Sequence, residues 1–173
     1  MNSDTLYAEA KKIYDAGNPH EALAKFEQAH AAYVAEGNRT QAATVANDLG
    51  VVYYLTGNRD KARQVLQEAL NDFEQTGNVL GQAKAVGNLA QLMYRAGDKP
   101  GAEKSYMRAG DLFHQAGEKT MEFDTYRALS QMQLQSGRWL EAIVSYDHAL
   151  AAKGGSGALR WFLQIPLRIL GIK

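Results

Sequence analysis

Small residues recur every 40 positions along this chain of 173 residues, and the period constrains the fold more than any other feature. Four columns keep the step without a break: Gly17, Gly57, Gly97 and Gly137; Gly37, Gly77, Gly117 and Gly157; Ala22, Ala62, Ala102 and Ala142; Ala29, Ala69, Ala109 and Ala149. A fixed period of roughly 20 to 50 residues is typical of solenoids, propellers and other repeat arrays. The sequence therefore predicts a series of equivalent supersecondary units.

Each unit has the pattern of two helices. Apolar residues recur at helical spacing over 40–56, and Gly57 then ends the helix as a C-cap glycine. Asn58 is placed to cap the next helix, whose apolar spacing continues over 62–73. Asn18 gives an equivalent start signal in the first unit. Strand patterns are absent from the sequence, so we predict an all-α fold.

The composition argues against several classes of function. The 19 basic side chains balance the 19 acidic ones, so the chain lacks the basic surface that draws proteins to nucleic-acid phosphates. It contains no cysteine, which excludes disulfide frameworks, thiolate zinc sites and cysteine nucleophiles. The first residues lack the pattern of a secretory signal, and no apolar run is long enough to cross a bilayer. We therefore expect a cytoplasmic protein.

No residue pattern indicates catalysis or metal binding. The four histidines do not form a helical pair with an intervening glutamate, and no carboxylate cluster has ligand spacing. No serine lies in the sequence of a nucleophile elbow. We predict that the chain is not an enzyme and uses no cofactor or metal.

The repeated columns resemble those of the tetratricopeptide repeat. That pattern places a leucine and a small residue in the first helix, glycine at the turn, and alanine, a large residue and alanine in the second helix. The second unit has Leu49, Gly50, Tyr53, Gly57, Ala62, Leu66 and Ala69; the third has Leu89, Ala90, Met93, Gly97, Ala102, Tyr106 and Ala109. The usual repeat has about 34 residues. The longer period here resembles the repeats of kinesin light chains, G-protein-signalling scaffolds and bacterial peptide-sensing regulators.

The resemblance implies a right-handed α-α superhelix, or solenoid, of four helix pairs followed by a C-terminal apolar helix. We expect the array to occupy residues 1–157, with repeats at about 3–37, 43–77, 83–117 and 123–153. Residues 158–173 form a separate capping or docking segment in this prediction.

The same resemblance implies a noncatalytic scaffold that binds a peptide or partner protein on its concave face. The first helix of each unit would line that face. The candidate peptide-binding residues are Asn47, Asp48, Tyr54, Lys84, Asn88, Gln91, Tyr94, Arg95, Arg127 and Gln131. Polar side chains on a helix face are also explained by solvation alone, and the two tyrosines by packing in the core. Both interpretations stay open from the sequence.

The segment after Gly154–Gly157 differs from the rest of the chain. Its polar residues Arg160, Gln164 and Arg168 form one narrow stripe on an otherwise apolar helix pattern. Three roles are compatible with this pattern: a cap on the array, pairing with another chain, and contact with a membrane surface. The alternative function is thus a self-assembling or membrane-surface component. Its candidate contact residues are Trp161, Phe162, Ile165, Leu167 and Ile169.

Overall fold

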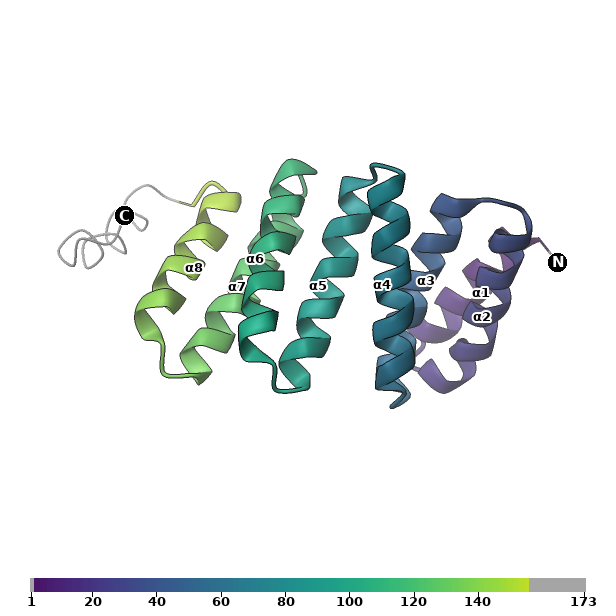
Figure 1. The fold of residues 1–173 in the computed structure, drawn as a ribbon, viewed down its shortest axis with the longest axis horizontal. Coiled ribbons are helices and arrows are strands. Elements are labelled where there is room, and N and C mark those ends of the chain that lie inside the picture. The colour runs from purple at the N-terminus through teal and green to yellow at the C-terminus, as the bar shows by residue number, and fades with distance from the viewer. Residues whose placement is uncertain (1, 156–173) are drawn as a thin grey trace. The chain divides into compact units, whose positions relative to one another are not determined.

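A computed structural model describes residues 2–155 of the protein, and Figure 1 shows these residues as helices joined by short turns. No strand occurs within this range, so the predicted all-α fold is confirmed for it. The helices are α1 (Ser3–Asp15), α2 (Pro19–Ala35), α3 (Arg39–Leu55), α4 (Arg59–Gln75), α5 (Val79–Arg95), α6 (Lys99–Gln115), α7 (Lys119–Gln135) and α8 (Trp139–Ala152).

Consecutive helices form pairs, such as α1 with α2, α3 with α4, and α7 with α8, and each pair falls in one 40-residue unit of the sequence. The first helices of the later pairs begin at Arg39, Val79 and Lys119, ahead of the expected repeat starts at 43, 83 and 123. Asn38 and Asn78 cap the first two of these helices with side-chain hydrogen bonds, whereas Glu118 makes no such bond at the start of α7.

The turn glycines end the helices as expected from the sequence. At the end of α3, Gly57 has a φ of 88°, a left-handed conformation that glycine adopts without a Cβ clash. The N–H of Asn58 then donates to the carbonyl of Tyr53 at 2.8 Å, which satisfies a carbonyl that the helix leaves unpaired. The turn therefore both stops one helix and delivers the cap of the next.

Two asparagines one period apart offer a matched test of helix capping. The side chain of Asn58 accepts a hydrogen bond from the N–H of Lys61, whereas Asn18 makes no side-chain cap bond. We expect Asn58→Ala to lower the free energy of unfolding by about 1 kcal/mol, because the N–H loses its acceptor. Asn18→Ala should cost much less. Urea denaturation of both variants checks this, and equal losses would contradict it.

The described residues divide into two compact units. The first ends at Ala102 and the second begins at Glu103, within α6. In the first unit, α3 packs against α2 and α4, and α5 packs against α3 and α4. Phe26, Leu66 and Phe73 are among the largest fully buried side chains there. An ideal Cβ on Gly50 would lie 2.5 Å from Cγ of Leu66, so a glycine is what fits where α3 approaches α4.

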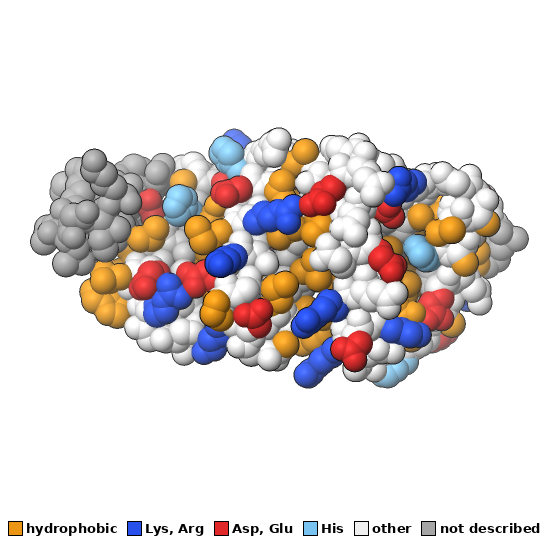
Figure 2. Space-filling view, in the orientation of Figure 1, with side chains coloured by type: hydrophobic (Ala, Val, Ile, Leu, Met, Phe, Trp, Pro, Cys, Tyr) orange, Lys and Arg blue, Asp and Glu red, His pale blue; other side chains and the backbone are white. Residues whose placement is uncertain are grey.

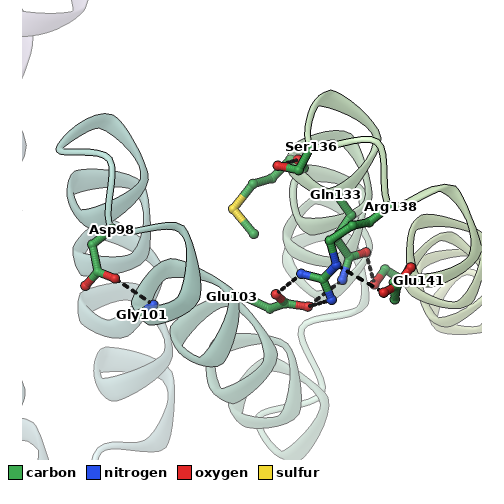
Figure 3. Close-up of polar contacts among 9 residues, drawn as sticks. Asp98, Gly101, Glu103, Gln133, Ser136, Arg138 and Glu141 are labelled. Carbon is green, nitrogen blue, oxygen red and sulfur yellow. Dashed lines mark hydrogen bonds and ion pairs between the residues drawn. The ribbon is translucent and has the colours of Figure 1, made fainter.

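A polar cluster joins α6, α7 and α8 in the second unit (Figure 3). Oε1 of Glu103 accepts from Nε2 of Gln133 at 2.8 Å, and Oε2 accepts from Nη1 of Arg138 at 2.5 Å. Ser145 donates to Oε1 of Gln133 at 2.7 Å. Gln133 is only 3% exposed, and these bonds satisfy its buried amide. The bond from Arg138 holds the pKa of Glu103 below its usual value.

None of the helices described within residues 2–155 is long and apolar enough to cross a bilayer. Figure 2 shows basic and acidic side chains interspersed over the face in view, without a large area of one sign. The predictions for residues 158–173, including the contact residues Trp161, Phe162, Ile165, Leu167 and Ile169, lie outside the described residues.

Candidate functional site

A chain of hydrogen bonds connects polar side chains of α1, α3 and α5. Tyr7 on α1 donates to Oδ2 of Asp48 on α3 at 2.7 Å. Asn47 donates to Oδ1 of Asp48 at 3.3 Å, and Asn88 on α5 donates to Oδ1 of Asn47 at 3.0 Å. We call these four residues, Tyr7, Asn47, Asp48 and Asn88, the polar ladder. It places three of the expected peptide-binding residues in one network within the first unit.

The members of the polar ladder differ in burial. Asn47 is 6% exposed and serves mainly as the inner link, whereas Tyr7, Asp48 and Asn88 are half-buried. Burial and the hydrogen bond to Asp48 raise the pKa of Tyr7 well above its usual value, so its hydroxyl stays a donor. A carboxylate oxygen and a side-chain amide can each make further hydrogen bonds. Asp48 and Asn88 can therefore bond a ligand without breaking the ladder.

A cavity of about 220 Å³ lies beside the polar ladder, between α1, α2 and α3. Its lining residues are Lys11, Tyr14, Asp15, Phe26, Asp48, Val51 and Val52. Buried Phe26 and Val52 make part of the wall apolar, and two carboxylates face one ammonium group around it. The cavity thus suits a side chain with an apolar stem and a cationic end.

The other expected peptide-binding residues of the first unit are neither members of the polar ladder nor lining residues of this cavity. Tyr54 is partly buried and packs against the hydrophobic core. On α5, Lys84, Gln91 and Arg95 are exposed and Tyr94 is half-buried.

Arg127 and Gln131 belong to α7 in the second unit. Both side chains are exposed and line a different cavity. Arg127 also pairs with Asp124 at 3.1 Å, one turn away on the same helix. An exposed pair of this kind contributes little to stability, so the guanidinium can exchange this partner for a ligand.

The contact between Asn47 and Asn88 escaped the sequence analysis. Alignment by the 40-residue period placed Asp48 and Asn88 in one column, whereas in the structure Asn88 contacts the preceding residue, Asn47. The same offset joins Tyr7 to Asp48. Neighbouring first helices are therefore staggered by one residue at the polar ladder. An alignment by the 40-residue period does not show this stagger.

Buried tyrosines tie α1 and α3 to α2 in the unit that carries the polar ladder. Tyr53 donates to Oε1 of Glu27 at 2.5 Å, and Tyr33 donates to Asp4. Burial and these bonds raise the pKa of both Tyr33 and Tyr53 to about 12.

Alkaline solution should therefore destabilise the protein. An unfolded tyrosine has a pKa of about 10, so the unfolded chain loses its tyrosine protons first as pH rises. The stability that these bonds provide is fully present below about pH 10 and is lost as pH rises towards about 12. Urea denaturation across this range measures the slope. Tyr53→Phe should flatten it, and an unchanged slope would contradict the role of Tyr53.

Within residues 2–155, no group of three or more histidine or carboxylate side chains could hold a metal ion.

Family models match both parts of the chain. Residues 5–75 match the tetratricopeptide repeat, and residues 53–164 match the soluble NSF attachment protein, SNAP. Together with the paired helices, these matches define the class of tetratricopeptide-repeat proteins. The chain belongs to this class and, through the match over more than half of its length, to the SNAP family. No curated protein sequence matches the chain.

Solved structures confirm the predicted solenoid fold. BtubC (BKLC) from P. vanneervenii superposes with a TM-score of 0.77 at 19% identity, covering 88% of this chain and 63% of that one. MamA has a TM-score of 0.66 at 20% identity, with coverages of 88% and 79%. TPR-like repeats from Podosopora anserina, assigned to a kinesin light chain, have a TM-score of 0.66 at 13% identity, with coverages of 97% and 94%. The fold is that of a protein-interaction scaffold.

Proposed function

We propose that the chain is a noncatalytic scaffold that binds a peptide segment of a partner protein on the face of α1, α3 and α5. The polar ladder is the observation that carries this proposal, because it aligns half-buried hydrogen-bonding groups across three successive first helices. Its bonds hold the side chains in place before a ligand arrives, which reduces the entropy lost on binding.

The chemistry of the face suggests how a peptide would bind. The amide of Asn88 and the carboxylate of Asp48 can pair with backbone N–H and C=O groups, as an extended or helical peptide requires. The adjoining cavity would take a lysine or arginine side chain, with its stem against Phe26 and its charge near Asp15 and Asp48. The resemblance to peptide-binding repeat proteins is consistent with this arrangement.

Selection from a random peptide library, displayed against the full chain, tests the proposal. We expect the selected peptides to share a basic residue at one position. Asp48→Asn should weaken binding of a selected peptide at least about tenfold, because it removes the charge while keeping the shape and the acceptor for Tyr7. Calorimetry with the purified variant measures the affinity.

Glu68→Gln provides the matched control, since it removes one charge from an exposed position of α4. Its affinity should equal that of the unaltered chain. If no peptide is selected, or if Asp48→Asn binds as tightly as Glu68→Gln, this face is not the binding site.

The alternative role through residues 158–173, in self-assembly or at a membrane surface, stays a prediction, as do the cytoplasmic location and the absence of nucleic-acid binding. Deleting residues 158–173 and measuring mass in solution and liposome binding tests the alternative. An unchanged monomer without liposome binding in either form would dismiss it.

A further inference from the structure

The last hairpin, α7 with α8, carries an apolar face that the corresponding positions of earlier hairpins do not expose. A cavity of about 380 Å³ is lined there by Arg127, Ser130, Gln131, Leu134, Ala142, Ile143 and Tyr146. Tyr146 is 38% exposed, whereas the residues at its position in the earlier repeats, Phe26, Leu66 and Tyr106, are 1%, 1% and 8% exposed.

Two further large apolar side chains of this hairpin are exposed. Leu134 on α7 is 56% exposed and Trp139 on α8 is 57% exposed. Trp139 stands where the first repeat has Pro19 and the second and third have Arg59 and Lys99, so the fourth repeat has a large apolar side chain where the two repeats before it have a charged one. Figure 2 shows hydrophobic side chains on the surface of α8, at the left of the view. An apolar face of this kind marks a surface that another element covers.

The first unit shows what covers an equivalent hairpin. There, α5 packs against both α3 and α4, and Gly81 of α5 lies directly against Phe73 of α4. The first helices begin at Arg39, Val79 and Lys119, so the same period puts the equivalent position of a next repeat at residue 159. The sequence after residue 158 can therefore be compared with α3 position by position.

The comparison with α3 agrees at most positions; among the exceptions, Leu159 and Trp161 correspond to exposed Arg39 and Gln41, and Leu167 corresponds to Asn47. The polar stripe Arg160, Gln164 and Arg168 corresponds to Thr40, Thr44 and Asp48, all exposed or half-buried in α3. The apolar residues Phe162, Leu163, Ile165, Ile169 and Ile172 correspond in order to Ala42, Ala43, Val45, Leu49 and Val52, all of them buried.

We propose that residues 159–173 dock as a helix on α7 and α8, in the register of a fifth first helix, and fill the cavity beside Tyr146. The tether Lys153–Ala158 is short, which gives the segment a high effective concentration at this face and favours docking within one chain. Pro166 removes one backbone hydrogen bond of this helix, so the segment depends on the face for its helical structure. Docking places Arg168 in the column of Asp48 and Asn88.

Crosslinking between two introduced cysteines tests the proposed register of residues 159–173 on α7. The chain contains no other cysteine, so only the introduced pair can react. Positions 127 and 168 correspond to Asn47 and Asn88, whose side chains meet at 3.0 Å. The full chain with Arg127→Cys and Arg168→Cys should react with a short bis-maleimide to give a crosslink within one chain in most molecules. The control pair is Arg127→Cys with Trp161→Cys. Trp161 corresponds to Gly81, which lies against Phe73 of α4, so position 161 should face α8 and not α7. The crosslink yield of the control pair should therefore be at least about fivefold lower.

Hydrogen exchange supplies a second readout that needs no crosslinker. Phe162→Asp combined with Ile169→Asp should speed amide exchange in α7 and α8 at least about tenfold, because it expels the segment from the cavity. The matched variant Arg160→Asp with Gln164→Asp should leave exchange unchanged, since both positions face away from the cavity in this register.

Several results would overturn the proposal. Equal yields from the two cysteine pairs would contradict the register, and crosslinks formed only between chains would identify a second copy as the occupant. Protection of α7 and α8 that appears only with vesicles of anionic phospholipid would assign the segment to a membrane. Unchanged exchange in the Phe162 and Ile169 variant would show that the segment does not cover this face. None of these results depends on peptide binding at the polar ladder.

Discussion

Leucine in place of Gly50 is expected to lower the free energy of unfolding by about 3 kcal/mol. A Cβ at this position would already lie 2.5 Å from Cγ of Leu66. Leu66 is 1% exposed and closely packed, so it has little space into which to move. The new side chain has to push α3 away from α4 and thereby loosen the hairpin that carries Asn47 and Asp48. Urea denaturation monitored by circular dichroism measures the loss.

Gln75→Leu is the control for this prediction. It adds an apolar side chain of the same size at an exposed position of α4, where nothing has to move, and it should change stability little. If Gly50→Leu were as stable as Gln75→Leu, the close approach of α3 and α4 would not be a requirement of the fold.

Tryptophan at Val51 is expected to weaken peptide binding on the order of 100-fold. Val51 is half-buried and lines the cavity of about 220 Å³ beside the polar ladder. An indole at this position would occupy the space proposed for a ligand side chain. Because position 51 is only half-buried, the indole can extend into the cavity without displacing core side chains. Calorimetry with a library-selected peptide measures the affinity, and the melting temperature should stay nearly unchanged.

Gln64→Trp places the same side chain at an exposed position of α4, away from this cavity. It should bind the peptide as tightly as the unaltered chain does. Comparable losses in both variants, or undiminished binding by Val51→Trp, would rule out the cavity as part of the binding site.

The arrangement of paired helices could be predicted because packing at helix crossings restricts side-chain size. Ala22, Ala62, Ala102 and Ala142 recur at one step and are all buried. The turn glycines mark the helix ends just as regularly, because glycine adopts the left-handed conformation at little cost. Side-chain size and preferred backbone conformation are properties of single residues. They can therefore be read from the residue types that recur in a repeated sequence.

The partners of the polar side chains were harder to predict, because they depend on how one helix is shifted against the next. Asn88 contacts Asn47 rather than the residue in its own column. Gln133 gave a usable signal, since it replaces the large apolar residues Ile13, Tyr53 and Met93 of its column. A buried amide needs hydrogen-bond partners, but its bond to Glu103 follows only from the packing of α6 on α7.

The polar ladder draws its members from three hairpins, since Tyr7 lies on α1, Asp48 on α3 and Asn88 on α5. Opening of one hairpin of a repeat array requires less free energy than unfolding of the whole array. If the hairpin of α1 and α2 opened, Tyr7 would lose its bond to Asp48 and one side of the cavity would open while the other helices stayed folded. The affinity for the proposed peptide would then fall at a lower temperature than that of the main unfolding transition. Peptide binding by this array would in that case depend on temperature while most of the chain is still folded.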